Sequence, residues 1–140
     1  MYQVVIDTNV LVAALRSKRG ASYRLLTLIG DPRWRMNVSV PLLLEYEDVT
    51  KRPGMVTGLS AQDIDDILDY ICAEANRRTI FYLWRPLLSD PKDDFILELA
   101  VECQCDFIVT YNAKDFVGAE RFGIAILTPK EFLQKLGEIP

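Results

Sequence analysis

Short apolar runs alternate with longer amphipathic stretches along this chain. Compact runs of β-branched and aromatic residues are typical of buried strands, whereas apolar residues spaced three and four apart indicate helices that bury one side. Strand and helix therefore alternate from one end of the sequence to the other. We predict strands at 4–6, 36–40, 79–83, 107–110 and 125–127, and helices within 10–15, 23–29, 41–52, 61–71, 93–103 and 129–136.

Residues that favour helix starts support this pattern. Pro41 suits the first turn of a helix, and Ser60 followed by Asp63 resembles a capping box. Thr128 stands directly before Pro129, where a hydroxyl can cap the last helix. Each of these signals falls at a predicted boundary between elements.

Strands that are wholly apolar predict an α/β fold, in which helices cover both faces of a mainly parallel sheet. We predict one domain over residues 1–140, a three-layer α/β/α sandwich with a central sheet of about five strands. Ligands of such sheets bind beyond the carboxyl ends of the strands. Asp7 and the segment 110–115 directly follow predicted strands and therefore belong to that edge.

The sequence contains no histidine. This absence excludes Ser-His-Asp and Cys-His nucleophile systems and imidazole zinc sites. An enzyme of this composition must rely on carboxylates or a lysine. The formal net charge of −4 does not attract nucleic acid to the whole surface, so such binding needs a local basic patch or bridging cations.

Cysteine usage and hydropathy indicate a soluble protein. The cysteines Cys72, Cys103 and Cys105 are odd in number, and the C-x-C spacing of the last two is unlike zinc or redox patterns. We therefore predict reduced, mostly buried thiols. No apolar run approaches the ~20 residues of a membrane span, and the sequence opens on a strand rather than on a basic and apolar leader. We expect a cytoplasmic location without membrane association.

Three acidic residues are candidates for chemistry, although each also has an ordinary interpretation. Asp7 follows an apolar strand and precedes a helix, where an aspartate often serves only as a cap. Glu45 comes directly after three leucines, so it either lies at the edge of the buried side of its helix or points into a pocket. A solvated glutamate is the commoner case. Asp94 suits a helix start, where the dipole favours acids.

In order and in context, these acids resemble the motifs of the PIN-domain nucleases, in particular the stand-alone, VapC-like toxins of toxin–antitoxin pairs. The run 5–9, which contains Asp7, is similar to the family's opening motif. Glu45 is similar to its helix-borne glutamate, and Asp94 to a third acid at the start of a later helix. The segment 110–116 resembles the closing motif, with Asn112 where many members carry an acid.

The resemblance implies a metal-dependent endoribonuclease that cleaves single-stranded RNA. It assigns Asp7, Glu45 and Asp94 as metal ligands, with Asp115 as a fourth acid. Oxygen ligands favour hard Mg²⁺ or Mn²⁺ ions, which also offset the repulsion between converging carboxylates. A homodimer and a small antitoxin protein that covers the acids are further implied. The residues expected to orient waters or carboxylates are Thr8, Asn9, Thr110 and Asn112.

Substrate phosphates require positive partners, and cations cluster after the first motif. An ordinary solvated loop is the alternative interpretation of this cluster. Three aromatic residues, Trp34, Tyr46 and Tyr111, are candidates to stack bases, although core packing is the commoner role of such side chains. The cations expected to hold RNA on the rim of the site are Arg16, Lys18, Arg19 and Arg24.

Two other functions remain open. A PIN-like module with an incomplete set of acids would bind a protein partner or nucleic acid without catalysis. An aspartyl phosphatase would use Asp7 as a nucleophile, but haloacid-type phosphatases carry a second acid two residues later, where this chain has Asn9. Asp93 is the alternative to Asp94 as the third acid. Metal-dependent cleavage of RNA separates a nuclease from both alternatives.

Overall fold

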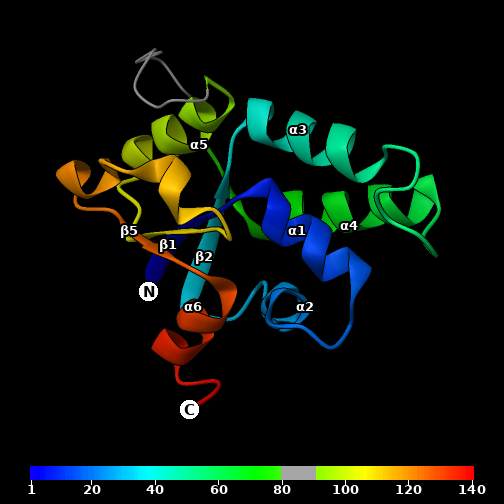
Figure 1. The fold of residues 1–140 in the computed structure, drawn as a ribbon, viewed down its shortest axis with the longest axis horizontal. Coiled ribbons are helices and arrows are strands. Elements are labelled where there is room, and N and C mark those ends of the chain that lie inside the picture. Colours follow the sequence, from blue (N-terminus) through cyan, green and yellow to red (C-terminus); the bar gives the residue numbers. More distant parts are fainter. Residues whose placement is uncertain (80–90) are drawn as a thin grey trace.

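A computed structural model of the chain describes residues 1–79 and 91–140, and every side chain in these ranges except those of 91–94. Within this part of the chain, five parallel strands form one sheet in the order β3-β2-β1-β4-β5 (Figure 1). The predicted parallel sheet is therefore confirmed. The strands are β1 (Tyr2–Ile6), β2 (Trp34–Val38), β3 (Asn76–Arg77), β4 (Phe107–Val109) and β5 (Ala125–Leu127).

Helices flank the sheet, which confirms the predicted α/β/α arrangement. Phe132 of the last helix packs edge-on against Trp34 of β2, whereas α5 contacts β1, β2 and β4 and lies across the sheet from α2 and α6 in Figure 1. The α-helices in the described ranges are α1 (Thr8–Arg16), α2 (Ala21–Thr27), α3 (Val40–Thr50), α4 (Ala61–Glu74), α5 (Pro91–Glu102) and α6 (Pro129–Leu136).

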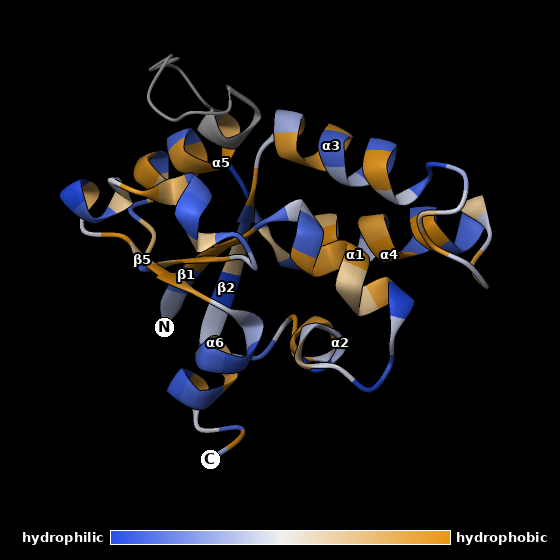
Figure 2. Cartoon of the chain, viewed as in Figure 1, coloured by the Kyte–Doolittle hydropathy of each residue, from blue (hydrophilic) through white to orange (hydrophobic). Residues whose placement is uncertain are grey.

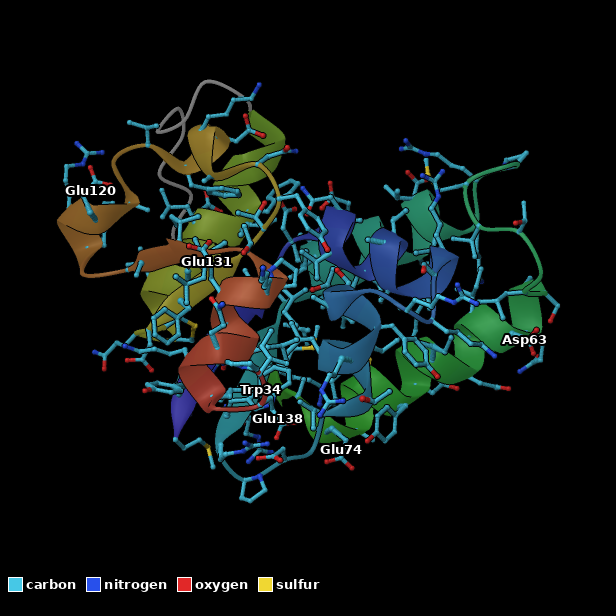
Figure 3. The ribbon with its side chains drawn as sticks, turned by 60° about the horizontal axis from the view of Figure 1, so that its bottom comes forward. Trp34, Asp63, Glu74, Glu120, Glu131 and Glu138 are labelled. Carbon is cyan, nitrogen blue, oxygen red and sulfur yellow. A yellow bond between two sulfur atoms is a disulfide. The ribbon has the colours of Figure 1, made fainter. Side chains whose placement is uncertain are left out.

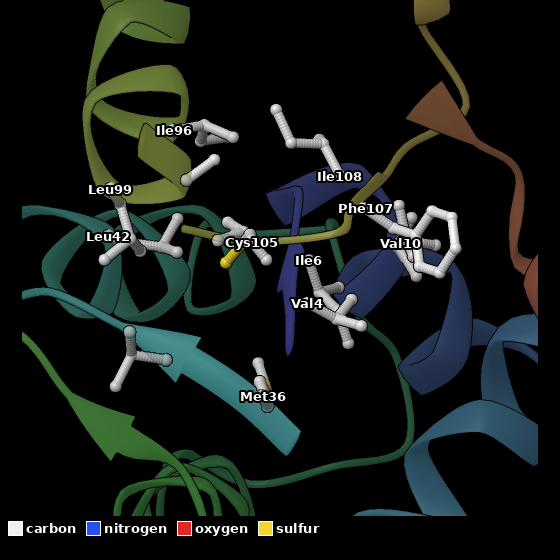
Figure 4. Close-up of a cluster of buried hydrophobic side chains, with 14 of the residues drawn as sticks. Val4, Ile6, Val10, Met36, Leu42, Ile96, Leu99, Cys105, Phe107 and Ile108 are labelled. Carbon is white, nitrogen blue, oxygen red and sulfur yellow. The ribbon is translucent and has the colours of Figure 1, made fainter. Parts of the chain in front are cut away.

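The hydrophobic core lies on both sides of the strands. In Figure 2 the strands β1 and β5 are mostly apolar and the helices alternate between apolar and polar residues. Figure 4 shows buried side chains of β1, β2 and β4 among those of α1, α3 and α5. Strands that are buried on both faces leave only their ends free for polar side chains.

The carboxyl ends of β1 and β4 lie next to each other. Ile6 pairs with Val109 in the parallel register, and the N–H of Asp7 donates to the carbonyl of Val109 at 2.9 Å. The N–H of Thr110 in turn donates to Leu127 of β5 at 2.9 Å. The first and last sequence motifs therefore meet at one edge of the sheet, as predicted.

The caps that the sequence indicated are present. Ser60 and Asp63 form a reciprocal capping box at the start of α4. Thr128 caps α6, with Pro129 in the first turn, and Glu131 completes a second capping box. These local contacts satisfy backbone N–H groups that have no partner inside their helix.

Several predicted strand boundaries differ from the observed ones by one or two residues. The strand predicted at 36–40 ends at Val38, because the Ser39 hydroxyl accepts from the N–H of Leu42 at 3.4 Å and caps α3. The strand predicted at 79–83 lies almost entirely outside the described residues. The strand that follows α4 is β3, where the polar Asn76 donates to the side chain of Asn37 at 3.2 Å.

The prediction that all three cysteines are reduced was wrong. Cys103 and Cys105 form a disulfide, with their Cα atoms 5.3 Å apart, while Cys72 is free. The cause lies in how α5 ends: Gln104 adopts a left-handed φ of 51°, and Cys105 N–H donates back to Ala100 at 2.9 Å. This Schellman-type turn brings the two thiols together.

None of the helices in the described ranges is long and apolar enough to cross a membrane.

Candidate active site

Asp7 occupies the gap between β1 and α1 and is 7% exposed. It caps α1, because its Oδ1 accepts from the N–H of Thr8 at 2.8 Å. Its Oδ2 accepts from the hydroxyl of Thr110 at 2.8 Å and from the amide of Asn9 at 3.3 Å. A cap needs only the first of these bonds. The other two fix the carboxylate in place, one from the residue after β4 and one from the first turn of α1.

The pKa of Asp7 is raised to about 6, mainly by burial and also by the charges of Glu45 and Asp115, against hydrogen bonds from Thr110 and Thr8 that lower it. A carboxylate close to two other acids is costly to ionise unless a cation compensates for it. The electrostatics therefore connect three of the four acids that the motifs indicated.

Glu45 projects from α3 toward the start of α1. It is half-buried, and its Oε2 accepts from the hydroxyl of Thr8 at 2.7 Å. The neighbouring Tyr46 is fully buried and donates its hydroxyl to the carbonyl of Ile6, the last residue of β1. Tyr46 thus fastens α3 to the strand that carries Asp7. Glu45 is therefore held at the site rather than freely solvated.

The residues predicted to orient carboxylates form one hydrogen-bonded network. Thr8 contacts Glu45, and Asn9 and Thr110 contact Asp7. Asn9 also donates weakly to the Thr110 hydroxyl at 3.4 Å. Asn112 takes part through its backbone N–H, which donates to the Thr110 hydroxyl at 3.0 Å, while the residue itself is exposed.

Asp115 lies in the short 3₁₀ helix η1 (Ala113–Phe116), which follows the closing motif. The residue is half-buried, and its N–H donates to the carbonyl of Asn112 at 2.9 Å. Phe116, next to it, is fully buried and anchors the turn. The turn thereby keeps Asp115 near enough for its charge to raise the pKa of Asp7.

Asp94 lies in the first turn of α5, and its side chain, like that of Asp93, is outside the described residues. Among the side chains that are described, no three potential ligands are arranged to hold a metal ion. The third acid of the motif is therefore placed at the start of a helix, as expected, but its contacts with Asp7 and Glu45 remain a prediction.

Comparison with known proteins decides the family. The model of the PIN domain matches residues 3–114 of this chain. The chain belongs to the PIN-domain family. The matched residues include Asp7, Glu45 and Asp94, whereas Asp115 follows the matched range. The motif resemblance to the PIN-domain family is therefore confirmed.

A solved structure shares the PIN fold. A chain in the crystal structure of VapBC2 from Rickettsia felis, bound to a DNA fragment from their promoter, superimposes with a TM-score of 0.60 and 16% identity. The match covers 90% of this chain and 98% of that one. At this identity the likeness establishes the fold. None of the curated proteins compared matches the sequence.

Three of the predicted RNA-binding cations of this PIN domain lie at or just after the far end of α1 from Asp7, and Arg24 lies in α2. Helix α1 has 9 residues, which corresponds to about 13 Å. Arg16 donates to the carbonyl of Met55 at 2.6 Å. Arg24 pairs with Glu138, which is labelled in Figure 3, at 2.8 Å. Two of the four cations are therefore already engaged with the protein.

Lys18, Arg19 and Arg24 line a hollow of about 450 Å³ between α2 and α6. Lys130, from the first turn of α6, contributes a fourth cation to this basic hollow. Sequence reasoning missed Lys130, because a local sequence pattern cannot connect it with residues that lie more than a hundred positions earlier. The basic hollow is defined by the packing of α2 against α6.

Sequence reasoning also missed that Tyr46 holds α3 against the end of β1. This role can be tested by substitution. Burial raises the pKa of Tyr46, so its hydroxyl remains a donor. Tyr46→Phe should leave the buried end of β1 without this bond and lower the free energy of unfolding by about 1–3 kcal/mol. Urea denaturation measures the loss. Tyr70→Phe is the matched control, because Tyr70 donates to Ile29 in a partly exposed position. Equal losses would contradict the assigned role.

Proposed function

We propose that this PIN domain is a divalent-metal-dependent endoribonuclease that cleaves single-stranded RNA. The observation that carries the proposal is the buried Asp7, whose pKa is raised by burial and by the charges of Glu45 and Asp115. Such an arrangement costs stability in the free protein. Among the described residues, no lysine or arginine contributes to the pKa of Asp7, so a bound cation would be the group that offsets this cost.

The donor set fits a hard divalent ion. The proposed ligands are Asp7, Glu45 and Asp94, directly or through water, with Asp115 as a fourth. All are carboxylates, which suit Mg²⁺ or Mn²⁺. When bound, such an ion lowers the pKa of a water and stabilises negative charge on a scissile phosphodiester.

The chain's own residues orient these carboxylates. Thr110 and Asn9 hold one oxygen of Asp7, and Thr8 holds one oxygen of Glu45. Hydroxyl and amide donors of this kind fix the direction of lone pairs and favour the ionised form of the acid. Thr8, Asn9 and Thr110 therefore act on the reaction by positioning, and Asn112 supports Thr110 through its backbone.

The test is incubation of the purified protein with mixed single-stranded RNA in Mg²⁺ or Mn²⁺, with EDTA as the control. We expect internal cleavage that requires the metal. Cleavage that persists in EDTA would point to a contaminating nuclease. Absence of cleavage with either ion, together with tight RNA or protein binding, would support the alternative of a non-catalytic PIN module.

The third and fourth acids should differ in importance. Asp94→Asn should lower the cleavage rate by about a hundredfold or more, whereas Asp115→Asn should lower it by about tenfold, because Asp115 is only half-buried in a 3₁₀ turn. Asp93→Asn is the matched control for the neighbouring position. Initial rates on one RNA measure all three. A larger loss of rate in Asp115→Asn than in Asp94→Asn would show that the fourth acid was misplaced. A larger loss in Asp93→Asn than in Asp94→Asn would identify Asp93 as the third acid.

We further propose that the protein is a homodimeric toxin paired with a small antitoxin. The support is the motif resemblance together with the fold shared with a chain of the VapBC2 complex. Co-purification with the product of a neighbouring gene, and inhibition of RNA cleavage by it, is the expected result. A monomer that no neighbouring gene product inhibits would contradict the proposal.

Lys18 and Arg19 are the proposed cations for RNA phosphates at a distance from the cleavage site. Both are exposed in the loop between α1 and α2, and both line the basic hollow with Lys130 and Arg24. Because Arg24 is paired with Glu138 and Arg16 holds Met55, these two predicted cations are assigned a smaller share in RNA binding. A single strand that leaves the acids would reach the hollow by running along α1.

A further inference from the structure

Tyr111 combines exposure with fixed position at the edge of the carboxylate site. Of the three aromatic residues that are candidates for base stacking, Trp34 and Tyr46 are buried, whereas Tyr111 is 49% exposed. It follows Thr110, the residue that donates to Asp7. An aromatic face open to solvent beside a catalytic acid is available to a ligand rather than to the core.

Both ends of Tyr111 are held by the protein. Its backbone N–H donates to the side-chain oxygen of Asn9 at 3.3 Å, and its hydroxyl is hydrogen-bonded to the hydroxyl of Ser22 in α2. Ser22 is 2% exposed and is thus a fixed anchor. The ring is therefore ordered before any ligand arrives, which removes most of the entropy cost of ordering a side chain on binding.

The two anchors connect Tyr111 with both proposed RNA contacts. Asn9 also donates to Asp7 at 3.3 Å, so one anchor belongs to the carboxylate network. The other anchor belongs to α2, whose first residues line the basic hollow with Lys18 and Arg19. Tyr111 is therefore tied both to the carboxylate network and to the helix that forms one wall of the basic hollow.

We propose that Tyr111 is a stacking platform for one nucleobase of single-stranded RNA next to the scissile phosphate. The proposal rests on the proposed ribonuclease function and specifies its substrate. A base within an A-form duplex is stacked on both sides and cannot lie on a protein ring, whereas a base of a single strand can. Tyr111 thereby selects unpaired RNA without reading a particular sequence, because every base has a face that stacks.

Four variants separate stacking from a structural role. Tyr111→Phe and Ser22→Ala remove the hydroxyl bond and keep an aromatic ring, whereas Tyr111→Ala removes the ring. Tyr70→Ala is the matched control, since Tyr70 is 46% exposed and hydrogen-bonded by its hydroxyl but lies in α4. Each is made in an Asp7→Asn background, so that RNA stays intact. The probe is a fluorescein-labelled single-stranded RNA of about ten nucleotides in Mn²⁺, read by fluorescence anisotropy.

Tyr111→Ala should weaken binding of the single strand by roughly 5- to 100-fold and leave binding of a duplex of equal length unchanged. Tyr70→Ala should bind like the parent protein, whereas Tyr111→Phe and Ser22→Ala, which keep the ring but release its hydroxyl end, should weaken binding by no more than about threefold. Unchanged binding by Tyr111→Ala would overturn the stacking role. A loss of RNA binding in Tyr111→Phe and Ser22→Ala as large as that in Tyr111→Ala, with a parallel fall in melting temperature, would also overturn the stacking role. The hydroxyl bond would then have a structural role.

Failure of the ribonuclease function itself is recognised by a separate measurement. The protein with its native Asp7 is assayed for metal-dependent cleavage alongside the binding series. Cleavage with unchanged binding by Tyr111→Ala contradicts only the stacking role. Absence of both cleavage and RNA binding contradicts the ribonuclease function and the stacking role together.

Discussion

Asp7→Asn is expected to abolish RNA cleavage and, in the absence of metal, to raise the melting temperature. Replacing even a residue that only supports a metal ligand typically costs 10- to 100-fold in metal affinity or activity, so loss of a ligand should cost at least about a hundredfold. Asparagine keeps the shape of the side chain and one acceptor for Thr8 or Thr110. The fold should therefore remain intact.

The gain in stability follows from the raised pKa of Asp7. Because the pKa of about 6 in the folded protein exceeds the ordinary aspartate value of 3.8, the native state holds this proton more tightly than the unfolded chain does. The free energy of unfolding should accordingly decrease as pH rises from about 4 to about 6, by at most about 3 kcal/mol. Asparagine avoids this loss but weakens the hydrogen bonds, so a net gain of about 1–2 kcal/mol is expected at pH 7.

Thermal melts in EDTA at several pH values measure this effect. The variant should melt higher than the native protein at pH 7, and the difference should shrink as pH falls toward 4, where the native Asp7 is protonated. A variant that melts lower at pH 7, or a difference independent of pH, would contradict the cost assigned to the buried charge. Full cleavage activity in Asp7→Asn would contradict its role as a ligand.

The second large effect is stabilisation of the native protein by Mn²⁺ or Mg²⁺. The folded chain holds Asp7 near the charges of Glu45 and Asp115, whereas unfolding separates them. A divalent ion should therefore bind the native state preferentially. At a concentration about a hundredfold above its dissociation constant, the ion adds about 2.7 kcal/mol, which corresponds to a rise of roughly 5–10 °C for a chain of this length.

Monovalent salt at equal ionic strength is the control for this experiment, because it screens repulsion without occupying a site. Mn²⁺ should raise the melting temperature well beyond this control in the native protein, and by much less in Asp7→Asn and Asp94→Asn. Equal gains in the native protein and in both variants would mean that the ion binds elsewhere.

The fold and much of the site could be predicted because both depend on strand ends. Asp7 and Thr110 each follow a short apolar strand, and parallel strands bring such residues to one edge whatever the sequence distance between them. Their contact, from the Thr110 hydroxyl to Asp7 at 2.8 Å, is the direct consequence. The position of Glu45 was less certain, because a helix after a strand can present a glutamate to solvent or to the site.

Other features depend on packing that no local pattern encodes. The hydrogen bond from Tyr46 to the end of β1 depends on how α3 packs in the fold. The apolar pattern of the sequence predicts only that Tyr46 is a core residue. Arg16, Lys18 and Arg19 follow Asp7 closely in sequence, but α1 places them at its opposite end, and Arg24 lies on the next helix. The disulfide between Cys103 and Cys105 depends on the left-handed turn at Gln104. Such a turn is expected at glycine rather than at glutamine, so the sequence did not predict it.

Titration calorimetry with Mn²⁺ tests most directly whether these acids form one metal site. The native protein is compared with Asp7→Asn, Glu45→Gln and Asp94→Asn, and with Asp48→Asn as a control acid on the exposed side of α3. We expect each of the first three variants to weaken Mn²⁺ binding by about tenfold or more and Asp48→Asn to leave it unchanged. Equal affinity in all five proteins would contradict a site shared by Asp7, Glu45 and Asp94.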